Sequence, residues 1–320
     1  MVIVLILALL LAYWTWRTWP RLGHLLYDAS TALEARLYRL EKITMPIAEM
    51  GMVTYQGGPD TPDRTLLLLH GYSADKTIWL RFARHFVDDC RVIIPDQAGH
   101  GETGFKAGGG YDIPTQAERM IQLLDACGIG KVHVIGNSMG GYVAAWLAAA
   151  HPGRIASLTL IDPAGLSSPE PSDMERLLAA GINPFLIHSP ADFKQLYRMT
   201  MASPPWVPGV VLAAIAERYQ DRREELAEIF EDFHASQPIG SRLGQIHAPT
   251  LLLWGREDRL LHVSSAEVWA KGIAGARLEI WDGIGHMPMV ERPAQTAALF
   301  RQFLERPRRS AAAKGQSKNY

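Results

Sequence analysis

Apolar and polar residues form alternating blocks along most of the chain, and these blocks predict strands and helices in turn. The apolar runs with the length of buried strands lie at 66–69, 91–94, 131–135, 158–161, 250–254 and 277–281. Helical spacing of apolar residues is found at 113–126, 142–150 and 294–304. Strands that alternate with helices in this way predict a mostly parallel sheet with helices on both faces, and therefore an α/β fold.

The alternation stops between about 166 and 246, where helical pieces rich in bulky apolar residues are separated by prolines. An insertion of this length after a strand predicts a helical lid at 166–246 with an apolar inner side. The lid divides the globular domain into a first part, 46–165, and a second part, 247–306. The polar, basic residues 307–320 are expected to form a disordered tail.

The N-terminus is an apolar run, interrupted by Thr15 and ending before the first charge at Arg17. A helix through Trp19 would be about 28 Å long, close to the thickness of a bilayer's hydrocarbon core of about 30 Å. We therefore predict a transmembrane anchor at 1–19. A cleaved signal peptide is disfavoured, because no basic residue precedes the run and no small-residue cleavage site follows it. A buried N-terminal helix is the other alternative.

Beyond the anchor, apolar residues recur at three- and four-residue steps as far as Leu40, which predicts an amphipathic helix within 20–45. This helix has three interpretations: packing on the globular domain, contact with the bilayer, or self-association into a homodimer through residues 1–40. Arg17 and Arg21 flank the C-terminal end of the anchor, so the positive-inside rule would leave the globular domain in the cytoplasm.

The composition is that of a packed enzyme, with 48% hydrophobic and 20% charged residues in a chain of 320. A net charge of −1 provides no polyanion-binding surface at the level of the whole chain, so no nucleic-acid partner is expected. Cys90 and Cys127 lack metal-site or disulfide-framework spacing. We expect both to be packing residues, although a single disulfide remains an alternative. No metal or cofactor is expected.

The segment Gly136-Asn137-Ser138-Met139-Gly140 fits the pattern G-x-S-x-G and lies between a predicted strand and a predicted helix. This context predicts a nucleophile elbow, a sharp turn that exposes the Ser138 hydroxyl above the sheet. Glycine at 136 and 140 avoids a clash that a Cβ would cause in such a turn. The N–H groups of Met139 and Tyr72 are expected to form the oxyanion hole, because Tyr72 follows the predicted strand at 66–69.

A serine nucleophile needs a base, and His286 follows the last predicted strand and precedes the final helix. It is also last in the chain order Ser, Asp, His. Asp258 follows the predicted strand at 250–254 and is expected to orient this base; Asp162, after the strand at 158–161, is the alternative. His70 and His100 are expected to structure their loops.

The resemblance to a known family is carried by the segments HGYSADKTIW, IIPDQAGHGET, GNSMGG, LIDPAGL, LLLWGREDRL and GHMPMVERP. Over residues 50–305 the chain resembles the α/β-hydrolase lipases. It is most similar to the membrane-anchored monoacylglycerol lipases of animals and the inner-membrane phospholipases A of Gram-negative bacteria.

This resemblance implies a triad of Ser138, Asp258 and His286, with Tyr72 and Met139 in the oxyanion hole. It implies glycerophospholipids and lysophospholipids as substrates and fatty acid as product. It further implies self-association near the anchor and a periplasmic domain at the inner membrane. This periplasmic placement is opposite to the cytoplasmic one that the positive-inside rule indicates. The alternatives are a monoacylglycerol lipase or broad carboxylesterase, a cofactor-free haloperoxidase, and a non-enzymatic lipid-binding membrane protein.

Overall fold

The computed structural model describes residues 2–47 and 50–305, with side chains of the first helix described at positions 4 and 6 and from 21 onward. Its centre is an eight-stranded sheet in the order β1-β2-β4-β3-β5-β6-β7-β8. The strands are β1 (Glu41–Ile47), β2 (Met50–Gly57), β3 (Thr65–Leu69), β4 (Arg91–Pro95), β5 (Val132–Asn137), β6 (Ile155–Ile161), β7 (Thr250–Gly255) and β8 (Arg277–Trp281). The pairs β1–β2 and β2–β4 are antiparallel and the others parallel. The predicted α/β fold is confirmed.

The central strands are buried on both faces, which explains why their sequences are continuous apolar runs rather than alternating ones. In β3, Leu67 and Leu69 belong to the hydrophobic core on one side of the sheet. Leu66 and Leu68 belong to the core on the other side. Successive side chains of a strand point to opposite faces, so a strand between two helical layers needs an apolar residue at every position.

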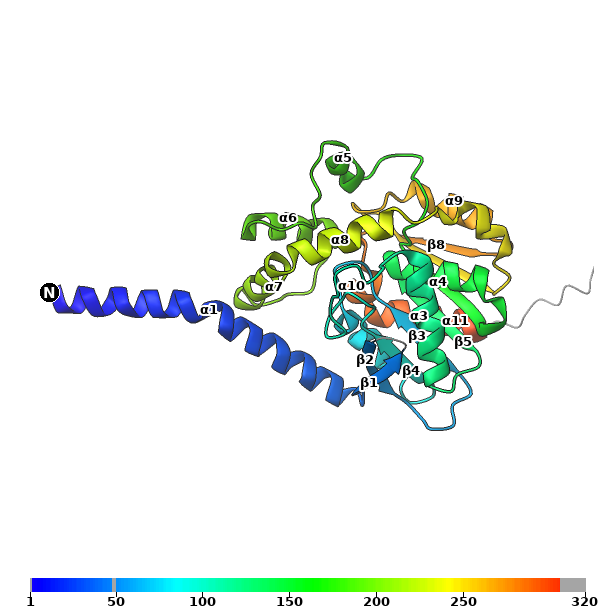
Figure 1. The fold of residues 1–320 in the computed structure, drawn as a ribbon, viewed down its shortest axis with the longest axis horizontal. Coiled ribbons are helices and arrows are strands. Elements are labelled where there is room, and N and C mark those ends of the chain that lie inside the picture. Colours follow the sequence, from blue (N-terminus) through cyan, green and yellow to red (C-terminus); the bar gives the residue numbers. More distant parts are fainter. Residues whose placement is uncertain (1, 48–49, 306–320) are drawn as a thin grey trace, which may run out of the picture.

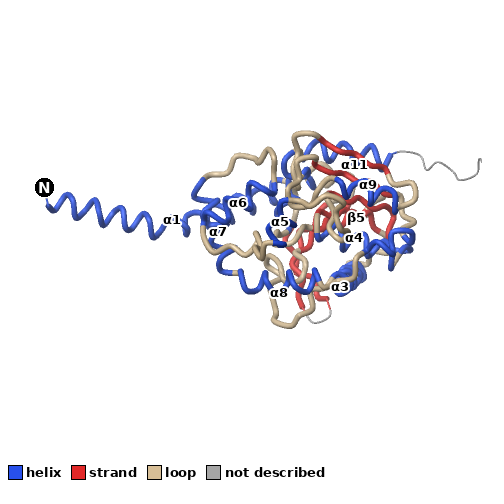
Figure 2. The backbone as a smooth tube through the Cα atoms, turned by 90° about the horizontal axis from the view of Figure 1, so that it is seen from above, coloured by secondary structure: helices blue, strands red, loops and turns tan. Residues whose placement is uncertain are grey.

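Helices cover both faces of the sheet (Figures 1 and 2). The core on one face includes α3 (Ile113–Ala126), α4 (Met139–Ala150) and α9 (Ser264–Gly272). The core on the other face includes the 3₁₀ helix η1 (Lys76–Trp79), α2 (Leu80–Ala83), α10 (Pro288–Glu291) and α11 (Pro293–Glu305).

The N-terminal helix α1 (Val2–Leu37) ends earlier than the helix expected within 20–45. Arg39 adopts a left-handed φ of 56°, the buried Leu40 follows, and β1 then begins at Glu41. The sheet therefore starts before the expected domain boundary at 46. The strand pair β1–β2 was not predicted. Only Ile47 of the edge strand β1 is buried, so β1 has no apolar run. In β2 the buried positions include the polar Thr54 and Gln56, which interrupt the apolar pattern.

Within the part of the chain that the structure describes, no helix combines the length and the apolar side chains that crossing a membrane requires. The anchor predicted at 1–19 falls mostly on positions whose side chains lie outside the described residues, as does the tail at 307–320. The N-terminal part of α1 projects away from the rest of the chain (Figures 1 and 2).

The segment 166–246, where a lid is expected, contains helices and no strand between β6 and β7. Its elements are α5 (Asp173–Ala179), α6 (Pro190–Thr200), α7 (Gly209–Asp221), α8 (Arg223–His234) and η3 (Ile239–Gln245). The capping boxes at Ser172 and Ser189 begin α5 and α6 by satisfying N–H groups at the first turn. The second half of α1 packs against α7, so the N-terminal helix and this segment share an interface.

Candidate active site

Ser138 occupies a sharp turn between β5 and α4. Its φ of 56° and ψ of −121° are unfavourable for a residue with a Cβ, so the surrounding chain holds it there. A Cβ on Gly136 would lie 2.1 Å from the carbonyl oxygen of Gly140, and a Cβ on Gly140 would lie 2.4 Å from that of His70. Both positions therefore require glycine, and the strand and helix cross closely enough to present the serine at the carboxyl edge of the sheet.

His286 lies in the loop after β8 and contacts Asp258, which follows β7. The His286 Nδ1 atom is 2.7 Å from Asp258 Oδ2, and both side chains are buried. Asp258 Oδ1 accepts hydrogen bonds from the N–H groups of Leu260 at 2.8 Å and Leu261 at 3.0 Å. A carboxylate fixed in this way assigns the ring proton to Nδ1, which leaves the Nε2 lone pair of His286 available as a base.

Asn137 connects the loop of His286 to the serine turn. Its side-chain amide donates to the carbonyl oxygen of His286 at 3.0 Å and to that of Ile161 at 3.1 Å. Ser138 and His286 line the same cavity of about 200 Å³. Sequence reasoning gave Asn137 no role beyond a place in the motif, because its two partners lie far away in the chain.

The loop after β3 lies against the nucleophile. A Cβ on Gly71 would come within 3.0 Å of the Ser138 Cβ, so the backbone of this loop reaches the serine. The Tyr72 hydroxyl donates to the carbonyl oxygen of Leu226 at 2.5 Å, which fixes the side chain against α8. Met139, whose N–H is the other expected oxyanion donor, is fully buried as the first residue of α4.

His70 has the loop-structuring contacts expected for it. Its Nε2 accepts from the N–H of Gln97 at 3.0 Å, and the Gln97 side chain donates to the His70 carbonyl oxygen at 2.6 Å. Burial lowers the pKa of His70, which favours the neutral ring that can accept this bond. Burial also lowers the pKa of His100 well below its usual value, in keeping with a structural histidine.

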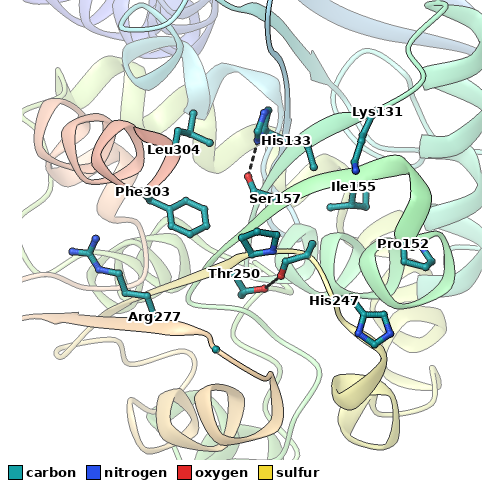
Figure 3. A pocket seen from close by; sticks show the side chains of 14 residues that line it. Lys131, His133, Pro152, Ile155, Ser157, His247, Thr250, Arg277, Phe303 and Leu304 are labelled. Atoms are coloured by element: carbon teal, nitrogen blue, oxygen red, sulfur yellow. Dashed lines mark hydrogen bonds between the residues drawn. The ribbon is translucent and has the colours of Figure 1, made fainter. Parts of the chain in front are cut away.

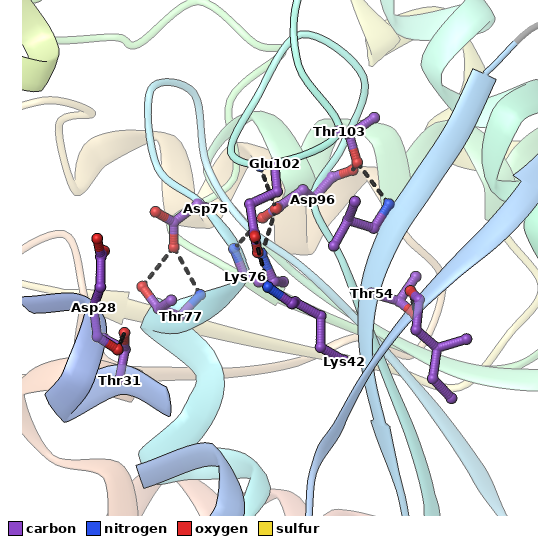
Figure 4. A network of polar contacts seen from close by, with 12 residues as sticks. Asp28, Thr31, Lys42, Thr54, Asp75, Lys76, Thr77, Asp96, Glu102 and Thr103 are labelled. Carbon is purple, nitrogen blue, oxygen red and sulfur yellow. Dashed lines mark hydrogen bonds and ion pairs between the residues drawn. The ribbon is translucent and has the colours of Figure 1, made fainter. Parts of the chain in front are cut away.

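A buried ion pair at Lys76 supports the loop after β3 (Figure 4). The Lys76 ammonium lies 2.6 Å from Asp96 Oδ2 and 2.6 Å from Glu102 Oε2. Asp96 Oδ1 also accepts the backbone N–H of Lys76 at 2.7 Å. No pattern in the sequence indicates this network, because the pairing of a lysine with carboxylates on another loop depends on the fold.

Glu291 is a further residue that the sequence did not single out. Its carboxylate accepts the N–H of Gly285 at 2.8 Å and that of Ser203 at 2.6 Å. The first bond holds the residue immediately before His286, and the second ties that loop to the connection between α6 and α7 in the segment 166–246. The effect is to fix the backbone that carries the histidine.

Ser138 contributes to the walls of two adjoining cavities. The first, of about 200 Å³, is lined by Tyr27 of α1 and by residues of α6 and α7. The second, of about 290 Å³, is lined by an aromatic group consisting of Tyr72, Phe185, Phe230 and Phe233. Ser138 therefore borders two chambers, both mainly apolar, which share Tyr72 and Phe185 in their walls.

A larger cavity, of about 930 Å³, lies elsewhere and contains another serine–histidine contact (Figure 3). There His133 Nδ1 is 2.7 Å from Ser157 Oγ. Ser157 lies within strand β6 rather than at a strand-to-helix turn. None of the predicted site residues lines this cavity.

Asp162 is fully buried beside Asp258 but is not the carboxylate that holds His286. Cys90 and Cys127 are both free thiols, one buried and one partly buried. The disulfide that the sequence left open is therefore absent from the described residues.

Comparisons with known proteins identify the family of the chain. The family model described as alpha/beta hydrolase fold matches residues 64–293, and the chain belongs to the α/β-hydrolase fold family.

Within that family the chain is similar to lipases. Monoacylglycerol lipase abhd6-B of Xenopus laevis is 32% identical over 252 residues, covering 75% of each protein. Lipase 1 of Psychrobacter immobilis is 32% identical over 269 residues, covering 82% of this chain and 84% of that protein. The crystal structure of a membrane phospholipase A, described as a bacterial virulence factor, superposes with a TM-score of 0.86 at 35% identity, covering 95% of this chain and 97% of that one. The expected resemblance is confirmed.

Proposed function

We propose that this chain is a membrane-anchored serine lipase of the phospholipase A type, which hydrolyses acyl esters of glycerophospholipids and lysophospholipids. The observation that carries the proposal is the 2.7 Å contact between His286 and Asp258, in a loop joined through Asn137 to the strained turn of Ser138. In this assignment Ser138 is the nucleophile, His286 the general base and Asp258 the residue that orients it.

The reaction has two half-reactions. As Ser138 Oγ attacks the ester carbonyl carbon, its proton passes to His286 Nε2, and the carbonyl oxygen becomes an oxyanion. When the intermediate collapses, the C–O bond to the glycerol oxygen breaks, and His286 returns the proton to that leaving oxygen. Water then attacks the acyl-serine by the same route, releasing fatty acid and restoring the Ser138 hydroxyl.

The oxyanion is stabilised by the backbone N–H groups of Met139 and Tyr72. The position of Met139 at the start of α4 adds the positive end of a helix dipole. Removal of one such donor typically costs about 3–4 kcal/mol of barrier. These donors belong to the backbone, so their contribution depends on the turn geometry set by Gly136 and Gly140 rather than on side-chain identity.

The two chambers at Ser138 support a lipid ester as the substrate. Phe185, Phe230 and Phe233 line a cavity suited to an acyl chain, because burying apolar surface is worth about 25 cal/mol per Å². The other chamber adjoins a more polar cavity of about 700 Å³, with which it shares Tyr27 and Tyr219. That arrangement provides separate room for the chain and for the glycerol part of the substrate.

The N-terminal helix supports delivery of substrate from a bilayer. Tyr27 of α1 lines the chamber beside Ser138, and its hydroxyl is 2.9 Å from Thr77 Oγ1. A Cβ on Gly23 would lie 2.1 Å from the carbonyl oxygen of Val210, so α1 and α7 are in close backbone contact there. One end of a single helix thus forms a wall of the chamber, while the other end carries the apolar run.

We place the anchor at 1–19 in the cell membrane with the catalytic domain on the periplasmic side, and assign the self-association to residues 1–40. The similarity to a membrane phospholipase A supports the membrane location.

Deletion of 1–19 should release the protein from washed membranes and reduce its cross-linked dimer. A deletion variant that stays bound would assign membrane binding to the remainder of α1 or to the lid. External protease should cleave the catalytic domain in spheroplasts, and full protection would place it in the cytoplasm.

The enzymatic test uses the purified full-length chain with a panel of phospholipids, lysophospholipids and monoacylglycerols, followed by quantification of released fatty acid. We expect release from phospholipids and lysophospholipids, and a fall of at least about 10⁴-fold in Ser138→Ala. Ser157→Ala is the matched control, because Ser157 also contacts a histidine, and it should retain full activity.

The outcomes separate the alternatives. Unchanged turnover by Ser138→Ala would refute the serine mechanism, whereas loss of turnover in Ser157→Ala alone would move it to the other cavity. Release from monoacylglycerols without release from phospholipids would refute the phospholipase assignment and identify a monoacylglycerol lipase. Lipid binding without any release would identify a lipid-binding protein.

A further inference from the structure

A second carboxyl group lies beside the proposed triad. Asp162 follows β6, is fully buried, and has a left-handed φ of 43°. Its Oδ1 accepts the N–H of Gly255 at 2.9 Å. Carboxylate oxygens of Asp162 and Asp258 and a ring nitrogen of His286 all lie within 4.8 Å of one another. The other oxygen of Asp162, Oδ2, is buried and receives no donor from the described residues.

Two carboxylates this close cannot both carry a charge at low cost in a buried site. Asp258 accepts three hydrogen bonds, from His286 Nδ1 and the N–H groups of Leu260 and Leu261. Asp162 accepts one, from Gly255. The better-stabilised anion is therefore Asp258, and the proton resides on Asp162.

The charged groups around Asp162 agree with this distribution. Burial, followed by the negative charge of Asp258, raises the pKa of Asp162 well above its usual value, and Glu291 acts in the same direction. A proton on Oδ2 also resolves the missing hydrogen bond, since Asp258 is the acceptor beside it.

We propose that Asp162 is a positioning residue, a neutral carboxylic acid whose Oδ2–H donates to Asp258 and holds that carboxylate against His286. This inference rests on the proposed function. The pair then presents one negative charge to the histidine instead of two. A second charge would hold the imidazolium too strongly for it to return its proton to the leaving group.

The test is the pH profile of kcat/KM for ester hydrolysis by Asp162→Asn and Asp162→Leu. Asparagine is uncharged and keeps both a donor and an acceptor, so the acidic limb should stay at its wild-type position. Leucine removes the donor, so kcat/KM should fall by about 10- to 100-fold and the limb should move to higher pH. If Asp162 were ionised, Asp162→Asn would shift the acidic limb of the kcat/KM profile to lower pH by about 2 pH units. That result would overturn the proposal.

A stability measurement gives a readout independent of activity. A carboxyl whose pKa is raised in the folded state contributes stability that is present at low pH and lost as the pH rises from the unfolded to the folded pKa. Asparagine has no such loss, so the Tm of Asp162→Asn minus that of the wild type should increase between about pH 5 and 8. A difference that is independent of pH would contradict a neutral Asp162. Asp125→Asn, at an exposed carboxylate paired with Arg154, is the control and should change neither profile.

Two further results keep the inference separate from the proposed function. If asparagine at 162 prevents folding, ¹³C carboxyl resonances of aspartate-labelled wild-type protein should still show a buried, non-titrating neutral acid, and its absence would refute the proposal. Full activity of Ser138→Ala would refute the mechanism itself, whereas a shifted limb in Asp162→Asn, with Ser138→Ala inactive, refutes only the role of Asp162.

Discussion

Replacement of Asp258 by asparagine should reduce kcat by about 10⁴-fold while leaving the fold intact. The reason is that the substitution moves the ring proton of His286 from Nδ1 to Nε2. The oxygen that faces Leu260 and Leu261 receives two N–H donors, at 2.8 and 3.0 Å. The asparagine oxygen must remain there, so its NH₂ group points at His286 Nδ1, 2.7 Å away in the wild type. The ring then carries its proton on Nε2 and cannot accept the proton of Ser138.

The size of the effect follows from the alternative orientation. A flipped amide would restore the active tautomer but direct its NH₂ at two backbone donors, and each unsatisfied N–H costs about 1–3 kcal/mol. The flipped state therefore lies roughly 2–6 kcal/mol higher, and a 10⁴-fold loss corresponds to about 5.5 kcal/mol, within that range.

The assay is the initial rate of p-nitrophenyl ester hydrolysis at saturating substrate, with thermal unfolding of the same preparation as the folding control. A fall in kcat with an unchanged Tm is the expected result. If Asp258→Asn kept more than about a tenth of the wild-type kcat, Asp258 would not control the histidine tautomer, and the assignment of the acid would fail.

Three other changes test separate parts of the site. Gly71→Ala places a Cβ 3.0 Å from that of Ser138, so kcat for p-nitrophenyl esters should fall at least about tenfold with little change in Tm; unaltered kcat would remove this loop from the site. Lys76→Met leaves the Asp96 carboxylate buried without its cation, so urea unfolding should show a loss of about 3–5 kcal/mol, whereas a loss below about 1 kcal/mol would show that the pair is not needed. Phe230→Ala enlarges the aromatic chamber, so competition between fatty acyl esters should shift toward longer chains, and unchanged selectivity would place the acyl chain elsewhere.

The sequence was sufficient to predict the parts of the fold in which local pattern and burial agree. Strands β3, β5 and β7 are buried on both faces, so their apolar runs identify them without knowledge of the neighbours. The turn at Ser138 was predictable because two glycines, a strand and a helix define it locally. The pair β1–β2 was missed, because β1 is an edge strand with exposed residues and β2 buries polar residues, so neither has a comparable signal.

The contacts that complete the candidate site could not be predicted in the same way. Glu291 reaches Ser203, which is 88 positions away, and Asn137 reaches His286, which is 149 positions away. Such pairings are defined only when the sheet brings the carboxyl ends of its strands together. Asp162 and Asp258 were both reasonable partners for the histidine, and only the geometry at His286 Nδ1 distinguishes them.

The most direct test of the central claim is mass spectrometry of the purified chain after reaction with a fluorophosphonate, which phosphonylates an activated serine hydroxyl. We predict a single stoichiometric adduct on the peptide that contains Ser138, together with loss of esterase activity. An unmodified Ser138, or an adduct on Ser157 in its place, would contradict the account.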